Sequence, residues 1–240
     1  MANEMRVKKR GMTASLLWGV LALGVGAAAG AFAMVDVVGA KVHRAQAVNE
    51  ARSIADMADN VGTWASTYKG VWIKDDGLTA KGVDIGSRID TQRYKQASEE
   101  TDPHGVFDTY HRKNPALIQR ELSDVIQKSD SRGKFRLTSD KYMNPVNAPD
   151  GFDLRAMQAL RQNGQREFYE IKSGEMRYAR RLVAKDSCMS CHDTPDKAPS
   201  TIARLYPGPQ GYGYVKGDLA GIISVRVPYV YDRSVVLDNL

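Results

Sequence analysis

The stretch Glu167-Phe-Tyr-Glu-Ile-Lys-Ser-Gly-Glu-Met-Arg-Tyr-Ala-Arg-Arg-Leu-Val-Ala-Lys-Asp-Ser-Cys-Met-Ser-Cys-His192 decides the fold of this chain. Its first part predicts two antiparallel strands, at about residues 167–171 and 176–184, joined by a tight turn at Ser173-Gly174. Its last five residues spell C-x-x-C-H. Because this motif comes late in the chain and directly after a strand, we expect a mixed domain of helices and sheet rather than a helical bundle.

The C-x-x-C-H motif is the attachment signature of a c-type haem. Cys188 and Cys191, the only cysteines in the chain, can form thioethers to the haem vinyl groups. His192 then supplies the proximal axial nitrogen to the iron. A disulfide between the cysteines would close a small, strained ring, which leaves a redox-active pair or a zinc site as the alternatives. We expect one covalently attached haem c.

An uncharged run over residues 14–35 is long enough to cross a bilayer as a helix. Four basic residues lie between Arg6 and Arg10, before the run. By the positive-inside rule, residues 1–12 form a cytoplasmic tail, residues 13–36 the anchor, and the rest lies outside. This predicts a single-pass protein of the inner (cytoplasmic) membrane with its haem domain in the periplasm, the side on which haem is attached to this motif.

A cleaved signal peptide is the alternative to an anchor, because Ala31-Phe32-Ala33 offers a small-x-small cleavage site. The apolar run is longer than the usual core of a signal peptide, which favours an uncleaved anchor. Gly26-x-x-x-Gly30 adds a face of small residues that favours association with another membrane helix.

One long helix is predicted after the anchor, within residues 37–74. Its small and apolar residues are spaced alternately by four and three positions, which is typical of a heptad seam. The seam consists of Ala47, Ala51, Ile54, Ala58, Val61, Ala65 and Tyr68. Two interpretations stay open: a stalk that forms a homodimer or binds another helix, or an amphipathic helix packed on its own domain.

The remaining residues, 75–240, are expected to form one outer domain. Residues 75–110 are polar and irregular, with a short helix expected near residues 91–98. Asn114 and Pro115 predict the start of a helix that reaches about Lys128. A short strand is predicted around residues 135–137, a helix capped by Asp150 over residues 152–162, and a last strand over residues 221–229. Together these elements predict an α+β domain with an antiparallel sheet.

Three stretches resemble one family of domains. They are Phe135-Arg-Leu-Thr-Ser-Asp-Lys-Tyr-Met-Asn-Pro-Val-Asn-Ala-Pro-Asp150, Ser187-Cys-Met-Ser-Cys-His192 and Gly211-Tyr-Gly-Tyr-Val-Lys-Gly-Asp-Leu-Ala-Gly-Ile-Ile-Ser-Val-Arg-Val-Pro228. The family is the single-haem, c-type, PAS-like periplasmic domain, which occurs in cyanobacterial haem proteins and as the outer sensor of some membrane histidine kinases and chemoreceptors. The resemblance implies a PAS-like antiparallel sheet with flanking helices and a haem held by the late loop. It also implies redox sensing, gas sensing or electron transfer.

The second axial ligand is the main departure from that family. A cyanobacterial relative uses a cysteine from an upstream helix, and this chain has no third cysteine. The foremost distal candidates are His111, which lies close to where that cysteine would fall, and Met143, in the Asn-Pro loop. Other candidates are His104, His43 and Met57, and an open site is a further alternative.

Arginines just before the motif are candidates for pairing with the haem propionates. They are Arg177, Arg180 and Arg181, with Tyr178 as a candidate wall of the pocket. Alternation along a strand predicts Arg177 and Arg181 on one face and Arg180 on the other. Solvated charges and an ordinary core are the alternatives to these roles.

The charge and motif content narrow the function. The net charge of the chain is +6, and part of it comes from the basic residues of the cytoplasmic tail. Because the outer domain is expected outside the cytoplasm, nucleic acid is excluded as a partner. No acid–base constellation accompanies the motif, so we expect no enzyme activity. We expect a membrane-anchored monohaem cytochrome that carries single electrons, with a redox partner protein or membrane complex. The alternative is a redox- or gas-responsive sensor module that acts through a partner.

Overall fold

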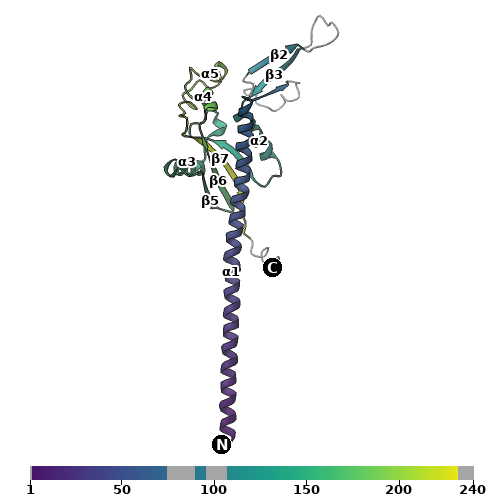
Figure 1. Ribbon diagram of the computed structural model, residues 1–240, viewed down its shortest axis with the longest axis vertical. Helices are drawn as coiled ribbons and strands as arrows, with labels where there is room; N and C mark the ends of the chain where they lie inside the picture. The colour runs from purple at the N-terminus through teal and green to yellow at the C-terminus, as the bar shows by residue number, and fades with distance from the viewer. Residues whose placement is uncertain (1, 75–89, 96–106, 232–240) are drawn as a thin grey trace. The chain divides into compact units, whose positions relative to one another are not determined.

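The computed structural model describes residues 2–74, 90–95 and 107–231 and divides the chain into two compact units. One unit comprises Met1–Gln46 with Val230–Leu240, and the other comprises Ala47–Tyr229. The second unit combines helices with two antiparallel sheets, which confirms the predicted α+β class (Figure 1).

The first helix, α1 (Ala2–Thr67), continues from the N-terminal tail into the second unit. From Ala14 onward it is long and apolar enough to cross a membrane. It ends at Thr67, within the segment 37–74 in which the long helix was predicted, and Lys69 and Gly70 after it have positive φ angles of 57° and 106°. A Cβ at position 70 would lie 2.5 Å from the carbonyl oxygen of Lys113, so only glycine fits this close approach.

The main sheet has four antiparallel strands in the order β4-β7-β6-β5. Their bounds are β4 (Lys134–Thr138), β5 (Glu167–Lys172), β6 (Glu175–Val183) and β7 (Leu219–Pro228). All four were predicted to within a few residues. Ser173 and Gly174 form the predicted turn between β5 and β6, both with positive φ.

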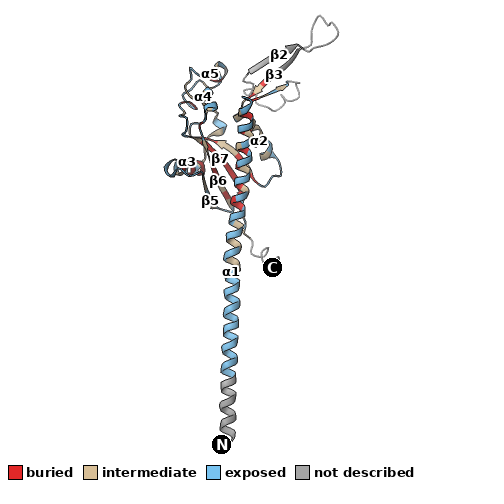
Figure 2. Ribbon diagram, in the orientation of Figure 1, coloured by how far each residue is buried: buried red, intermediate tan, exposed pale blue. Residues whose placement is uncertain are grey.

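One face of this sheet packs against α1. Phe135, Tyr178 and Val225 point from three neighbouring strands into the same core as the seam of the helix. The seam alanines at 47, 51, 58 and 65 are almost completely buried, whereas Tyr68 is exposed. Figure 2 shows the buried positions gathered on the sheet and on this part of α1. Over residues 47–58, therefore, the heptad spacing serves packing on the protein's own domain, the second of the two interpretations.

Two further helices confirm the capping signals read from the sequence. Helix α2 (Pro115–Lys128) begins after Asn114, whose side chain accepts a hydrogen bond from the backbone N–H of Leu117. Helix α3 (Gly151–Asn163) begins after Asp150 with a capping box that Asp153 completes. The apolar side of α3 packs on the opposite face of the main sheet, against Ala179 and Ile222.

A second, three-stranded sheet lies between α1 and α2 in the chain. Its order is β1-β3-β2, with β1 (Val71–Lys74), β2 (Asp90–Lys95) and β3 (Phe107–Lys113). The helix predicted near residues 91–98 is therefore wrong over residues 91–95, and residues 96–98 lie outside the described residues. Every residue of β2 pairs with β3, and this ladder overrides a weak local preference.

Candidate functional site

The C-x-x-C-H motif lies on a short helix, α4 (Asp186–His192), that follows β6 directly. Cys188 and Cys191 are half-buried free thiols. Their spacing of three places both on the same side of the helix, and His192, four positions after Cys188, lies on that side as well. Neither thiol is in a disulfide, so both remain available for bonding.

His192 is held by the segment Gly211–Tyr214 from the loop before β7. Its Nδ1 lies 2.6 Å from the carbonyl oxygen of Gly211, a distance at which Nδ1–H donates to that oxygen. The ring stacks on Tyr214, with centroids 4.6 Å apart and planes inclined by 11°. The backbone N–H of Tyr214 also donates to the carbonyl of His192, at 3.0 Å. These contacts fix both the tilt and the rotation of the imidazole.

The protonation of His192 suits a metal ligand. Burial lowers the pKa of its imidazole, and the hydrogen bond to Gly211 only partly opposes this. The ring is therefore neutral at physiological pH. With Nδ1 bound to the carbonyl, Nε2 is the nitrogen that carries the free lone pair.

Tyr214 is itself fixed by the loop that follows β4. Its hydroxyl donates to the Ser139 hydroxyl at 3.2 Å and lies 3.3 Å from the carbonyl oxygen of Lys141. The ammonium of Lys141 lies 5.9 Å from the centre of the tyrosine ring and donates to the carbonyl of Gly213 at 2.7 Å. The loop after β4 thus supports the residue that supports His192.

Gly211 has a φ of +90°, and a Cβ there would lie 2.5 Å from the Cβ of Met143. Met143 therefore packs directly against the glycine whose carbonyl holds Nδ1 of His192. The Asn-Pro loop and the Gly-Tyr-Gly-Tyr stretch, 68 positions apart from Met143 to Gly211, meet at this point. Any side chain at position 211 would displace the carbonyl that orients the histidine.

The donor set was tested against the two chemistries that the motif suggests. Within the described residues, no three histidine, cysteine or carboxylate side chains converge as ligands of one metal ion would. The two thiols on α4 instead match a role in covalent attachment. The neutral histidine with Nε2 available matches a role in axial ligation. The residues present therefore fit a c-type haem better than a zinc ion.

The distal candidates lie in different parts of the structure. His111 is buried on β3 of the three-stranded sheet, opposite Ile73 of β1. Met143 lies beside Gly211, on the Nδ1 side of the His192 ring. His43 lies 5.7 Å from the ring of Tyr231 in the other unit, and His104 is outside the described residues. Of these, only Met143 is placed near His192 by a recorded contact, and the distal role of each stays a prediction.

Met57 occupies a different setting. It is 45% exposed on α1, and it lines a cavity of about 530 Å³. The other lining residues are Ser53, Asp56, Asn60, Val61 and Trp64, all on α1. A methionine is usually buried in a core, so a half-exposed one beside a cavity of this size is a candidate for binding.

Three of the four candidate propionate and pocket residues already have partners. Arg177 contacts Asp150 at 2.8 Å, and the buried Arg180 contacts Asp56 at 2.6 Å on the opposite face of the sheet, as the alternation predicted. Tyr178 is fully buried, and burial together with its hydrogen bond to Glu167 raises its pKa to about 12. Arg181 is half-buried. Their roles toward a haem stay predictions.

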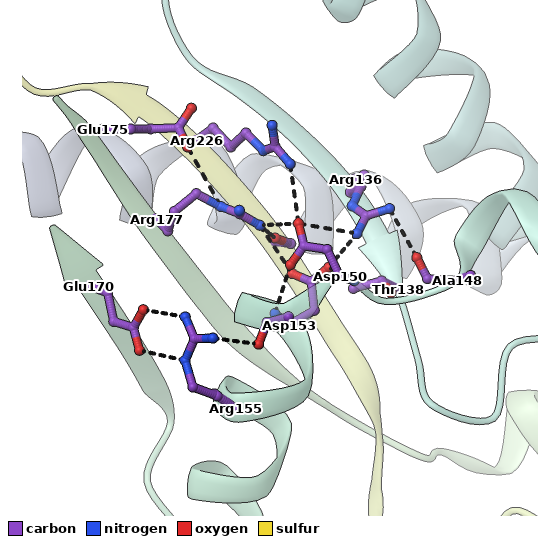
Figure 3. A network of polar contacts seen from close by, with 12 residues as sticks. Arg136, Thr138, Ala148, Asp150, Asp153, Arg155, Glu170, Glu175, Arg177 and Arg226 are labelled. Atoms are coloured by element: carbon purple, nitrogen blue, oxygen red, sulfur yellow. Dashed lines mark hydrogen bonds and ion pairs between the residues drawn. The ribbon is translucent and has the colours of Figure 1, made fainter. Parts of the chain in front are cut away.

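Two features of the structure escaped the reading of the sequence. The first is Gly211. A glycine beside a turn can mark a position where the backbone lies close to another segment, and this was the available signal. The second feature is a network of Arg136, Asp153 and Arg226 around Asp150, shown in Figure 3. Alternating arginines on two neighbouring strands were the available signal.

Comparison with known proteins gives two matches. The model of the Tll0287-like family matches residues 40–228. A solved structure, described as the cyanobacterial haem-protein Tll0287, is 26% identical over 50% of this chain and 75% of that chain, with a TM-score of 0.45. No curated protein matches the chain.

Proposed function

This chain belongs to the Tll0287-like family, and from that premise we propose that it is a membrane-anchored, single-haem c-type protein that carries electrons one at a time. The observation that carries the proposal is His192, a neutral ring with Nδ1 bound to Gly211 and Nε2 available, beside two free thiols. A bound haem would supply a one-electron couple at its iron. The protein's part is to attach it through Cys188 and Cys191 and to orient the axial imidazole.

We further propose that Met57 of α1 is the second axial ligand. Two ion pairs indicate that α1 and β6 run in the same direction: Arg52 pairs with Glu167, beside Tyr178, and further along Asp56 pairs with Arg180. The part of β6 from Arg180 to its last residue, Val183, is about 10 Å long, and α4 begins soon after, at Asp186. About 10 Å along α1 covers six to seven residues.

Counted from Asp56, that distance places residues 62–63 of α1 alongside the end of β6, from which the C-x-x-C-H helix starts, and Met57 lies about 8 Å before them on the helix. The open cavity of about 530 Å³ runs along this side of α1, and Met57 is one of its lining residues. A thioether is a soft ligand that suits haem iron, and a His/Met pair raises the reduction potential compared with two histidines. Met143 is less suited, because it lies on the Nδ1 side of His192, which faces away from the iron.

The apolar part of α1 supports a place in the membrane. We propose that this helix is a single-pass anchor in the inner membrane, with the unit formed by Ala47–Tyr229 in the periplasm, as the basic residues before the helix favour. Haem c, a periplasmic position and one anchor suit an accessory subunit that passes electrons to or from a membrane complex.

A gas- or redox-responsive sensor is the second candidate. The half-exposed position of Met57 beside an open cavity favours it, because a thioether held there can give way to a small ligand such as CO or NO. The two functions differ in how firmly the sixth position is held.

Optical spectra of the purified full-length protein, oxidised and reduced, with and without CO, test these proposals. We expect haem to stay bound after denaturation in the wild type and to be lost in Cys188→Ser/Cys191→Ser. Met57→Ala should convert a low-spin spectrum to a high-spin one, while His111→Ala and Met143→Ala leave it unchanged. A spectrum unaffected by Met57→Ala would refute the ligand assignment. Rapid CO binding by the reduced wild type would favour the sensor over the carrier.

A further inference from the structure

The segment Val230-Tyr231 follows β7 and belongs to the same compact unit as the apolar part of α1. The hydroxyl of Tyr231 donates to Asp36, whose backbone carbonyl oxygen lies at 3.2 Å and whose Oδ1 lies at 3.4 Å. The ring of Tyr231 also lies beside that of His43, with centroids 5.7 Å apart. Two residues about two helical turns apart on α1 therefore contact the same tyrosine.

The burial of α1 between these two contacts follows the helical period. Asp36, Gly39, Ala40 and His43 are half-buried, whereas residues 37–38 and 41–42 are exposed. Positions spaced by three and four residues share one face of an α-helix. Tyr231 thus lies on one side of α1, and the other sides remain open to the surroundings.

The level of this contact along α1 follows from the uncharged run before it. Residues 14–35 form a helix about 33 Å long, close to the roughly 30 Å of hydrocarbon in a bilayer. Asp36 is the first charged residue after the run. In the proposed membrane position of α1, Asp36 therefore lies where the hydrocarbon meets the headgroups. Its hydrogen bonds with Tyr231 place the tyrosine at the same level.

Aromatic residues with a polar tip are enriched at both interfaces of a membrane, because the ring is apolar and the tip can remain hydrated. Trp18, at the inner end of the uncharged run, is 71% exposed and lies about 27 Å before Asp36 along the helix. Between Trp18 and Trp64 the sequence contains neither tryptophan nor tyrosine. Tyr231 thus supplies, from the segment after β7, the aromatic residue that α1 lacks at the outer interface.

Exposed apolar side chains lie close to this level as well. Val37, Val38 and Val42 of α1 are 54%, 48% and 50% exposed, and Val230, next to Tyr231 in the chain, is 70% exposed. Apolar surface of this kind is unfavourable in water and favourable at the boundary between headgroups and acyl chains. The outer end of the uncharged run is therefore followed by a surface suited to lipid rather than to water.

We propose that Val230 and Tyr231, together with Val37, Val38 and Val42, form a contact surface for the phospholipid headgroup region of the outer leaflet. The inference rests on the proposed membrane position of α1 and is independent of haem attachment. Two side chains from the segment after β7 bury too little area to hold the protein on a membrane without α1. Their role is to keep the chain that follows β7 at the membrane surface.

Site-specific photocrosslinking of the full-length protein tests the proposal, in nanodiscs of phosphatidylethanolamine and phosphatidylglycerol. The photoreactive residue p-benzoylphenylalanine replaces Tyr231 in one variant and Val230 in a second. The second variant keeps the hydrogen bonds between Tyr231 and Asp36, and its exposed position tolerates a larger side chain. After irradiation, mass spectrometry detects phospholipid attached to the protein. We expect lipid adducts at both positions.

Two further positions are the controls for this experiment. Val25, in the middle of the uncharged run, should give lipid adducts, and Tyr169 on β5, an exposed tyrosine of the other unit, should give none. Adducts at Val25 without adducts at Val230 and Tyr231 would overturn the contact surface and leave the anchor standing. Equal yields at Tyr169 and Val230 would overturn it too. Absence of adducts at Val25 would refute the membrane position of α1 and this inference with it.

Discussion

His192 illustrates how much of this site depends on single residues far apart in sequence. The C-x-x-C-H spacing predicts an axial-ligand role for the ring, but the orientation of the ring comes from the carbonyl of Gly211 and the ring of Tyr214. Tyr214 is held in turn by Ser139. A positioning residue of this kind should be recognised by effects on the iron rather than on folding alone.

Tyr214 gives the corresponding prediction. Tyr214→Phe keeps the ring stacked on His192 and should leave the reduction potential close to that of the wild type. Tyr214→Leu removes the stacking and should shift both the potential and the iron–histidine band in resonance Raman spectra. Redox titration of the three proteins provides the measurement. Equal potentials in all three would show that Tyr214 has only a packing role.

Asp150 gives a prediction of pH dependence. Burial alone raises its pKa, but the backbone N–H of Asp153 and the guanidinium groups of Arg177 and Arg136 outweigh burial and lower the pKa to about 2. The pKa of Asp150 in the folded protein lies below the ordinary value of 3.8. Ionised Asp150 therefore stabilises the fold fully above about pH 4, and this stabilisation is lost as the pH falls through 2.

Urea unfolding at pH 6 and pH 3 measures this effect. At pH 6 the free energy of unfolding of the wild type should exceed that of Asp150→Asn by about 1 kcal/mol, a value reduced because Asp150 is partly exposed. At pH 3 the difference should be smaller. A difference that is constant with pH would contradict the assignment.

The heptad seam of helix α1 has a spacing that suits two partners equally well, namely the domain's own sheet or another helix. The seam alanines at 47, 51 and 58 are buried in one core with Phe135, Tyr178 and Val225 of the domain's own sheet. Small residues allow the helix backbone to lie close to the strands, and the close approach leaves little room for larger side chains.

Ala51→Leu tests this packing. The added side chain must displace the core, so we expect a loss of about 1–3 kcal/mol in the free energy of unfolding. Ala45→Leu on the same helix is the control, because Ala45 is exposed and the change should alter stability by less than about 0.5 kcal/mol. Denaturation followed by circular dichroism compares them. Similar stabilities for the two variants would argue that the seam is free for another partner.

At the scale of the whole molecule, the two units have different physical requirements. The unit Ala47–Tyr229 contains its own apolar core, whereas the described part of the apolar stretch of α1 exposes Leu17, Trp18 and Leu23. Exposed side chains of this size over such a length are stable in a bilayer and unfavourable in water.

Removal of residues 1–36 should therefore release the protein from the membrane fraction without unfolding the domain. Carbonate extraction followed by circular dichroism of the soluble fraction measures both effects. If the shortened protein still sediments with membranes, another part of the chain or a membrane partner holds it there.

Local signals in the sequence determined the α+β class, the helix caps at Asn114 and Asp150, and the four strands of the main sheet, because each depends on residues only a few positions apart. The helix expected over residues 91–95 failed, since pairing with β3 decides that segment. Tertiary structure alone decided what the seam of α1 packs against, how His192 is oriented, and which arginines gather around Asp150. These depend on contacts between residues tens of positions apart, and such contacts exist only once the sheet has formed.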